Sequence, residues 1–254
     1  MLKEIHEQPQ ALRQAISGRI DEMKGEVDLE VDLPKEYLNS LEEIQFVAAG
    51  MSCYAGLYAS QLFEEYADVR TSVEVASEHE FGGRDPWRTL VIAVTQSGET
   101  ADTLSALREA KRAGARTLAI TNTLGSTVTR EADDTVFIRA GPEIGVATTK
   151  TFCSQAATMA LVATHVGRRW DTISSSEARS LLEDVCGLPG AVQQALDAEA
   201  DVREAAEDYA DGDAFFFIEC RLGAPVALEG ALKLKEISYD HAEGFPAGEL
   251  NRGT

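Results

Sequence analysis

Residues 89–95 read TLVIAVT, an uncharged run that is apolar between its two terminal threonines. Strands without a polar face are typical of parallel sheets, because helices cover both faces of such sheets. Weaker strand patterns lie at 44–50, 72–77, 117–121 and 134–140, and helical patterns lie at 53–66, 101–114 and 148–168. This order predicts an α/β fold, a three-layer sandwich around a five-stranded parallel sheet of the flavodoxin-like or Rossmann-like type.

The two ends of the chain differ from this central part. Leu12, Ile16 and Ile20 recur every four residues, which predicts a helix over 1–24 that glycines weaken or end. The segment after it, which contains Pro34, is expected to be a linker. Beyond the central part we expect a helical stretch, a strand and a further helix, at 176–210, 214–220 and 225–237.

The second strand–helix pair resembles the beginning of the central part. A shift of 171 residues sets Phe46 on Phe217 and Phe63 on Leu234. A domain of this kind needs on the order of 120 residues, so a second copy is expected to be incomplete. The expected segments are an N-terminal helix and linker (1–40), a first α/β domain (41–170), a helical connector (171–212) and the start of a second domain (213–254).

Composition excludes several classes of function. The net charge is −20, whereas nucleic-acid binding needs a basic surface. No apolar run reaches the ~18 residues of a membrane helix, and the polar N-terminus does not read as a secretory signal. Cys53, Cys153, Cys186 and Cys220 form no CxxC pair, which argues against structural zinc and favours a reducing cytoplasm. We expect all four to fill the core, and we expect no metal and no cofactor.

Two strand-to-helix turns carry hydroxyl groups. Thr95, Gln96, Ser97 and Thr100 surround a glycine after the strongest strand, and Ser52 follows a glycine after the first strand. Backbone N–H groups at a helix N-terminus bind anions, so these turns suit a phosphate. Plain helix capping by Thr100 is the alternative. The two turns meet only if the sheet sets their strands side by side.

A third segment carries a carboxylate between basic residues. Lys233 and Glu236 lie near a helix C-terminus, where the helix macrodipole disfavours an acidic side chain. A carboxylate with a tuned pKa is a usual base for removing a proton beside a carbonyl. His241 and Glu243 could orient it, although a buried structural histidine fits equally well. Glu229 is expected to face solvent or to cap a neighbour.

Three motifs together are similar to those of a known family: QSGETADTL (96–104), EIGVATTK (143–150) and ALEGALKLKEISYDHAE (227–243). They resemble the isomerase half of the glutamine–fructose-6-phosphate aminotransferases, the glucosamine-6-phosphate synthase family, which is built from two sugar-isomerase (SIS) domains. The resemblance implies binding of fructose 6-phosphate or glucosamine 6-phosphate, aldose–ketose isomerisation with amination at C2, and a homodimer. It implies sugar contacts from Ser52, Thr95, Gln96, Ser97, Thr100, the backbone of Val146, and Thr148. Glu236 would move the proton between C1 and C2, assisted by Lys233.

The chain departs from the family pattern in several places. Thr95 stands where a serine is usual and Met51 where a threonine is usual. Arg252 stands where the family has a ring-opening histidine, and arginine stays protonated near neutral pH. Against this resemblance we expect the chain to lack the family's glutaminase domain and C-terminal tail lysine, and we expect a separate glutaminase chain as a possible source of ammonia. An amino sugar phosphate deaminase or isomerase and a non-catalytic sugar-phosphate-binding module remain alternatives.

The charge balance generates the first prediction. The chain has 16 arginines, only 7 lysines and 43 acidic residues, a balance that suggests a salty cytoplasm in which ions screen self-repulsion. We therefore expect the chain to unfold as KCl is lowered, because its carboxylates then repel one another unscreened. Far-UV circular dichroism across a KCl series checks this, and a melting temperature independent of salt would contradict it.

Overall fold

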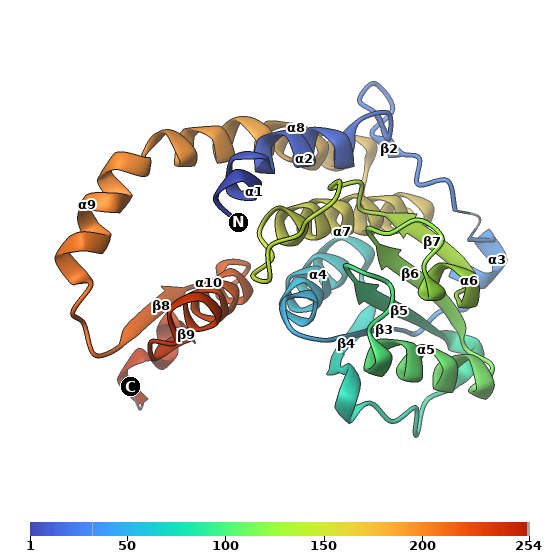
Figure 1. Ribbon diagram of the computed structural model, residues 1–254. Helices are drawn as coiled ribbons and strands as arrows, with labels where there is room; N and C mark the ends of the chain where they lie inside the picture. Colours follow the sequence, from blue (N-terminus) through green and yellow to red (C-terminus); the bar gives the residue numbers. More distant parts are fainter. Residues whose placement is uncertain (32, 253–254) are drawn as a thin grey trace.

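The computed structural model describes residues 1–31 and 33–252 (Figure 1). Its centre is a parallel five-stranded sheet with the strand order β4-β3-β5-β6-β7, which confirms the predicted α/β class. The strands are Glu43–Ala48 (β3), Arg70–Val75 (β4), Thr89–Thr95 (β5), Arg116–Thr121 (β6) and Asp134–Phe137 (β7). The run 89–95 forms a central strand in which every residue is buried.

Helices cover both faces of this sheet, as the apolar strands require. On one face lie α4 (Met51–Ala67) and α7 (Lys150–Arg169), and on the other lies α5 (Ala101–Ala113) (Figure 1). Side chains alternate between the faces of a strand. Ile92 and Val94 of β5 therefore join the cluster under α4 and α7, while Val91 and Ala93 join the cluster under α5. The result is the expected three-layer sandwich.

The N-terminal segment differs from its prediction. Instead of one helix over 1–24, the chain forms α1 (Leu2–His6) and α2 (Gln8–Ile16), then a short antiparallel pair of strands, β1 (Ile20–Asp21) and β2 (Glu26–Val27). Pro9 lies in the first turn of α2, where its missing N–H costs no helical hydrogen bond. Gly18, at φ +74°, turns the chain out of the helix. The expected linker contains β2 and the short helix α3 (Lys35–Leu38).

The C-terminal half begins with two helices instead of one continuous stretch. Helix α8 (Ser175–Asp197) packs on α2 and α7, and α9 (Glu199–Tyr209) continues from it as an arm without a buried residue (Figure 1). A capping box fixes the start of α8: Ser174 accepts the backbone N–H of Glu177, whose carboxylate accepts the backbone N–H of Ser174. The arm leads to a small second sheet.

The second sheet has the strand–helix–strand order of the first. Strands β8 (Phe215–Glu219) and β9 (Ala242–Pro246) pair in parallel, and α10 (Gly223–Ser238) connects them, as α4 connects β3 and β4. The sequence did not predict β9, because the Gly, His and Glu residues that follow α10 are typical of a loop. A Cβ atom at Gly244 would lie 2.8 Å from the backbone of Leu228, so only glycine lets α10 pack this closely on β9. Helix α10 also packs against α4 of the first sheet (Figure 1).

The remaining elements are short. They are the 3₁₀ turns Ala76–Glu78 (η1), Pro86–Arg88 (η2) and Ala247–Arg252 (η3) and the helix Thr127–Glu131 (α6). The expectation that all four cysteines fill the core is wrong, because Cys186 and Cys220 are exposed and the other two are partly buried. Among the described residues, no helix is long and apolar enough to cross a membrane.

The core beneath α4 yields a stability prediction. Phe63 of α4 is fully buried and meets Phe46 of β3 edge-on, with ring centroids 5.5 Å apart. Phe63→Ala should lower the free energy of unfolding by about 3–5 kcal/mol, because it leaves a cavity and removes the aromatic contact. Trp87→Ala is the control: its side chain is 75 % exposed, so a change within about 0.5 kcal/mol is expected. Denaturant unfolding at fixed salt measures both, and equal losses would contradict the assignment of Phe63 to the core.

Candidate functional site at the carboxyl edge of the first sheet

The two hydroxyl-bearing turns lie next to each other. Strands β3 and β5 are paired in parallel, and Ala48 is the partner of Val94. The turn that leads to Ser52 and the turn 96–100 therefore leave the same edge of the sheet from neighbouring strands. The strand order changes direction here, because β4 lies on one side of β3 and β5 on the other. Ligands of open α/β sheets bind at such a switch point.

The turn after β5 is held by its own hydroxyl groups. Thr95 Oγ1 lies 3.1 Å from Thr100 Oγ1 and accepts the backbone N–H of Gly98 at 3.2 Å. Ser97 Oγ accepts the backbone N–H of Glu99 at 3.2 Å. A side chain at Gly98 is excluded twice, since its φ is +71° and a Cβ atom would lie 2.1 Å from Ser126 Oγ. The glycine thus lets the turn lie directly on the neighbouring loop.

The turn after β3 is held by α7, a helix that lies about a hundred residues later in the sequence. Ser52 is buried in the first turn of α4, and its Oγ accepts the Nε2–H of Gln155 of α7 at 2.9 Å. Gln155 is itself fully buried and its Oε1 has no hydrogen-bond partner. Gln155 is not among the residues predicted from the sequence. The available signal was a glutamine within a helix rich in Ala and Thr.

The electrostatics of this edge favour an anion. Helices α4 and α5 both begin here, at Met51 and Ala101, and neither has a side-chain cap on its first N–H groups. The N-terminal N–H groups of a helix carry partial positive charge. The hydroxyl groups of the two turns and the uncapped N–H groups of the two helices therefore lie at the same edge of the sheet. The plain-capping alternative for Thr100 is contradicted, because its side chain makes no capping hydrogen bond.

A third loop, residues 140–149, carries the other two candidate residues. Val146 is 96 % exposed and Thr148 is partly buried. Carboxylates fix the backbone around them: Glu4 of α1 accepts the N–H groups of Ile144 at 2.6 Å and Gly145 at 3.1 Å. These backbone hydrogen bonds are the main reason that the pKa of Glu4 falls to about 2.

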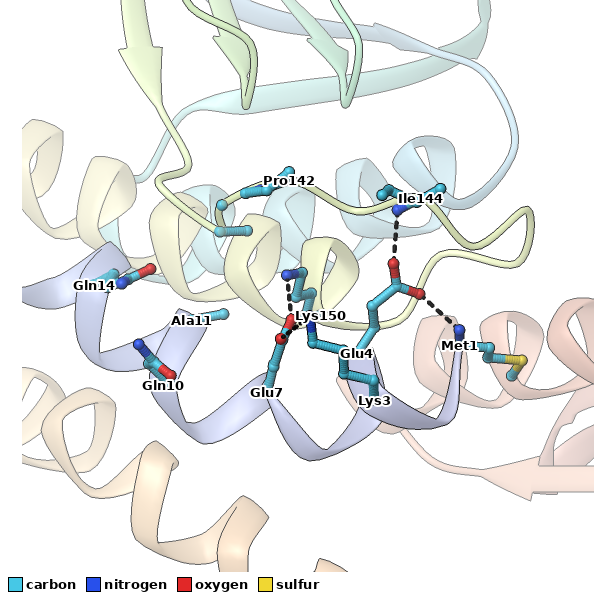
Figure 2. A pocket seen from close by; sticks show the side chains of 12 residues that line it. Met1, Lys3, Glu4, Glu7, Gln10, Ala11, Gln14, Pro142, Ile144 and Lys150 are labelled. Atoms are coloured by element: carbon cyan, nitrogen blue, oxygen red, sulfur yellow. Dashed lines mark hydrogen bonds and ion pairs between the residues drawn. The ribbon is translucent and has the colours of Figure 1, made fainter.

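Glu4 and Glu7 line a cavity of about 330 Å³ between α1, α2 and this loop. Figure 2 shows Glu4 directed at Ile144, and Glu7 paired with the buried Lys150, whose Nζ is 2.7 Å from Glu7 Oε2. None of the candidate sugar-contact residues lines this cavity. Its walls instead hold the loop in place, so we assign it a supporting role.

Helix α10 carries the candidate base, Glu236, and the candidate helper, Lys233. Lys233 Nζ lies 2.6 Å from Glu236 Oε2 and 3.4 Å from Glu229 Oε1, so the ammonium bridges two carboxylates on one helix face. The Glu236 side chain is 34 % exposed and remains open to solvent. Among the described residues, no hydrogen bond links Lys233 or Glu236 to the three loops. What joins the two parts is the packing of α10 on α4.

The expectation for Glu229 is wrong. Its side chain is only 6 % exposed, because it faces the α4 side of α10 and not solvent. Burial raises its pKa to about 7, against the opposing charge of Lys233, and neither carboxylate oxygen has a hydrogen-bond partner. Residues four apart share a helix face. The spacing of Glu229, Lys233 and Glu236 therefore indicates that the three side chains share one helix face, although it does not indicate that Glu229 is buried.

His241 and Glu243 follow the C-terminal end of α10. His241 is exposed, so its buried alternative is wrong, and its Nε2 lies 3.4 Å from Glu243 Oε1. Its carbonyl accepts the N–H of Phe215, which places it at the start of β8. The side chain of Arg252 lies outside the described part of the structure. Within that part, no group of three or more His, Cys, Asp and Glu side chains could hold a metal ion.

Comparisons with known proteins agree with this architecture. A model of the SIS domain matches residues 37–165. The chain is 62 % identical over 254 residues to the glutamine–fructose-6-phosphate aminotransferase [isomerizing] of Halobacterium salinarum and covers 42 % of that protein. It is 47 % identical over 257 residues to the enzyme of the same name from Thermus thermophilus, again covering 42 %. All of the chain is matched in both cases.

A solved structure matches over the whole chain as well. It is the C-terminal domain of glucosamine-fructose-6-phosphate aminotransferase from Francisella tularensis, with a TM-score of 0.93, 36 % identity and 71 % of that domain covered. The chain spans less than half the length of the two curated relatives named above. On the family match and this likeness, which confirm the resemblance of the three motifs, the chain belongs to the SIS-domain family.

Proposed function

We propose that this chain binds fructose 6-phosphate or glucosamine 6-phosphate at the carboxyl edge of its first sheet and interconverts ketose and aldose there. The observation that carries the proposal is the meeting of two hydroxyl-bearing turns, at Ser52 and at 95–100, where two uncapped helix N-termini also begin. Such an edge suits a phosphate dianion. The names of the similar enzymes supply the sugar.

The phosphate would take its hydrogen bonds from one compact set of groups. Ser52, Ser97 and Thr100 have hydroxyls that can donate, and Thr95 is already shared between Thr100 and Gly98. Gln96 uses its carbonyl to accept the N–H of Asn122 at 3.2 Å, which leaves its side chain for the sugar. The backbone at Val146 and the hydroxyl of Thr148 would contact the sugar from the third loop.

Glu236 would move the proton. Isomerisation needs a base that takes the proton from the carbon beside the carbonyl and returns it to the neighbouring carbon, through an enediol. The electron pair of the broken C–H bond forms the C=C bond, the carbonyl π pair moves onto oxygen, and that oxygen takes a proton from water. In the second half the neighbouring hydroxyl gives a proton to water as its own C=O bond forms, and Glu236 returns its proton to the other carbon. Glu236 is 34 % exposed and its Oε2 lies 2.6 Å from Lys233 Nζ, so its carboxylate is accessible to a ligand and has a cation beside it.

The similar enzymes suggest a wider setting for this reaction. Their names describe an aminotransferase that uses glutamine, and this chain matches 42 % of their length. We therefore propose that it acts in amino sugar biosynthesis, in the cytoplasm, as a homodimer, with ammonia from a glutaminase domain or a separate glutaminase chain. A deaminase would instead release ammonia from glucosamine 6-phosphate, and a binding-only module would bind a sugar phosphate without turnover.

Ligand binding is the first test. Fructose 6-phosphate and glucosamine 6-phosphate, added in high salt, should raise the melting temperature in a concentration-dependent way, because each binds the folded state alone. Inorganic phosphate and fructose are the controls and should act more weakly than the whole ligand. If neither sugar phosphate shifts the melting temperature, the site assignment is wrong.

Catalysis is tested with Glu236→Gln. The variant keeps the size of the side chain but cannot accept a proton, so the formation of glucose 6-phosphate from fructose 6-phosphate should fall about 10²- to 10⁴-fold. The thermal shift by fructose 6-phosphate should persist. Glu65→Gln, an exposed position on α4, is the matched control and should keep full turnover. Unchanged turnover in Glu236→Gln would remove Glu236 from this role, and binding without turnover in the parent would favour the binding module.

A further inference from the structure

We infer that Asn122 is a positioning residue for the proposed sugar-phosphate site, because it joins the phosphate turn (96–100) to the sugar loop (140–149). In the proposed function the first segment holds the phosphate and the second contacts the sugar. The inference rests on that function and adds the residue that sets the spacing between the two segments. Asn122 directly follows β6 and is not among the residues predicted from the sequence.

The register of the sheet places Asn122 between these two segments. Thr121, the last residue of β6, is the partner of Thr95 in β5 and of Phe137 in β7. The chains that leave the three strands therefore emerge side by side at the carboxyl edge, with Asn122 in the middle. The phosphate turn follows β5 on one side, and the segment that enters the sugar loop follows β7 on the other.

The backbone of Asn122 holds the phosphate turn. Its N–H donates to the carbonyl oxygen of Gln96 at 3.2 Å. The hydroxyl groups of Thr121 and Thr123 donate to the same oxygen at 3.3 and 3.4 Å. A carbonyl oxygen has two lone pairs, so these three donors saturate it. The peptide group at the start of the turn is therefore fixed relative to the end of β6.

The side chain of Asn122 holds the beginning of the sugar loop. Its Oδ1 accepts the N–H of Ala140 at 2.9 Å, and its Nδ2 donates to the carbonyl of Gly141 at 2.7 Å. Only one orientation of the amide satisfies both neighbours, because one is a donor and the other an acceptor. The amide thus takes the place of a backbone peptide group where the chain turns away from β6, with φ of +61° at Arg139 and +71° at Gly141.

Asparagine is the residue that these two contacts require. An aspartate could accept the N–H of Ala140, but its carboxylate would repel the carbonyl of Gly141, and an alanine could make neither contact. Glu4 and Glu143 hold later positions of the sugar loop, whereas Asn122 connects its beginning to the phosphate turn.

This connection bears on binding because a hexose 6-phosphate must contact both segments at once. A spacing that is set before the ligand arrives spares the cost of ordering the two segments on binding. Loss of the Asn122 side chain should therefore weaken binding of the sugar phosphate, while the proton transfer by Glu236, on another helix, should change little.

The contact is tested first without ligand, by amide hydrogen exchange followed by NMR. Asn122→Ala should speed the exchange of the Ala140 N–H about 10-fold or more, because that N–H loses its acceptor. Asn122→Asp keeps the acceptor and should preserve the protection. The N–H of Ile138, which donates to the carbonyl of Thr121 at 2.9 Å, is the internal control and should keep its rate within about 2-fold. Unchanged exchange of Ala140 in Asn122→Ala would overturn the inference.

The functional consequence is tested by calorimetric titration with fructose 6-phosphate and by isomerisation kinetics. Asn122→Ala and Asn122→Asp should each raise Kd and KM about 10-fold while kcat stays within about 3-fold, because the proton transfer uses other groups. Asn39→Ala, the same change at an exposed position after α3, is the matched control and should keep all three values within about 2-fold. A merely structural role of Asn122 would lower the melting temperature without raising Kd or KM, and that result would contradict the positioning role.

The two proposals fail in different ways. If fructose 6-phosphate does not bind the parent, the proposed function is wrong, and with it the ligand for which Asn122 would set the spacing. If the parent binds the sugar phosphate and both Asn122 variants bind it equally tightly, the proposed function stands and the inference about Asn122 falls.

Discussion

The pairing of β3 with β5 is the contact on which the candidate site depends. A parallel strand must satisfy its backbone hydrogen bonds through its neighbours, so the register of these two strands is fixed along their whole length. Because both strands run in the same direction, both following turns emerge at one edge. Because helices must then cover opposite faces of the sheet, α4 and α5 begin together and point their N–H groups at that edge. The chemistry of the site is a consequence of the sheet.

Contacts from outside the sheet hold this edge in place. Gln155 reaches Ser52 from α7, and Glu4 reaches the backbone of the 140–149 loop from α1. Within that loop Glu143 accepts the N–H groups of Thr149 at 2.7 Å and Lys150 at 3.1 Å, and so caps α7. The contacts of Gln155 with Ser52 and of Glu4 with the loop each join residues more than a hundred positions apart in sequence. The exposed Val146 is thus carried on a loop whose backbone is fixed at both ends, which suits a segment meant to contact a ligand.

Helix α10 of the second sheet packs against α4 of the first domain, and this packing buries one of its carboxylates but not the other. Where α10 packs on α4, Glu229 loses water, while Glu236 at the end of the helix keeps it. Burial raises the pKa of Glu229 to about 7, and Lys233 lies between the two carboxylates. The two groups have the same chemical type, and only their environments differ.

Sequence alone determined the sheet, the order of its central elements and the turns that carry hydroxyls, because apolar strands and helix periodicity are local patterns. It also determined the acidic balance and the motifs that matched the SIS family. Only the tertiary structure decided that β3 and β5 are neighbours, that residues 1–24 break into two helices and a hairpin, and that 242–246 form a strand. It also decided that Glu229 is buried. Burial depends on which helix lies opposite, and no pattern within α10 indicates that α4 lies there.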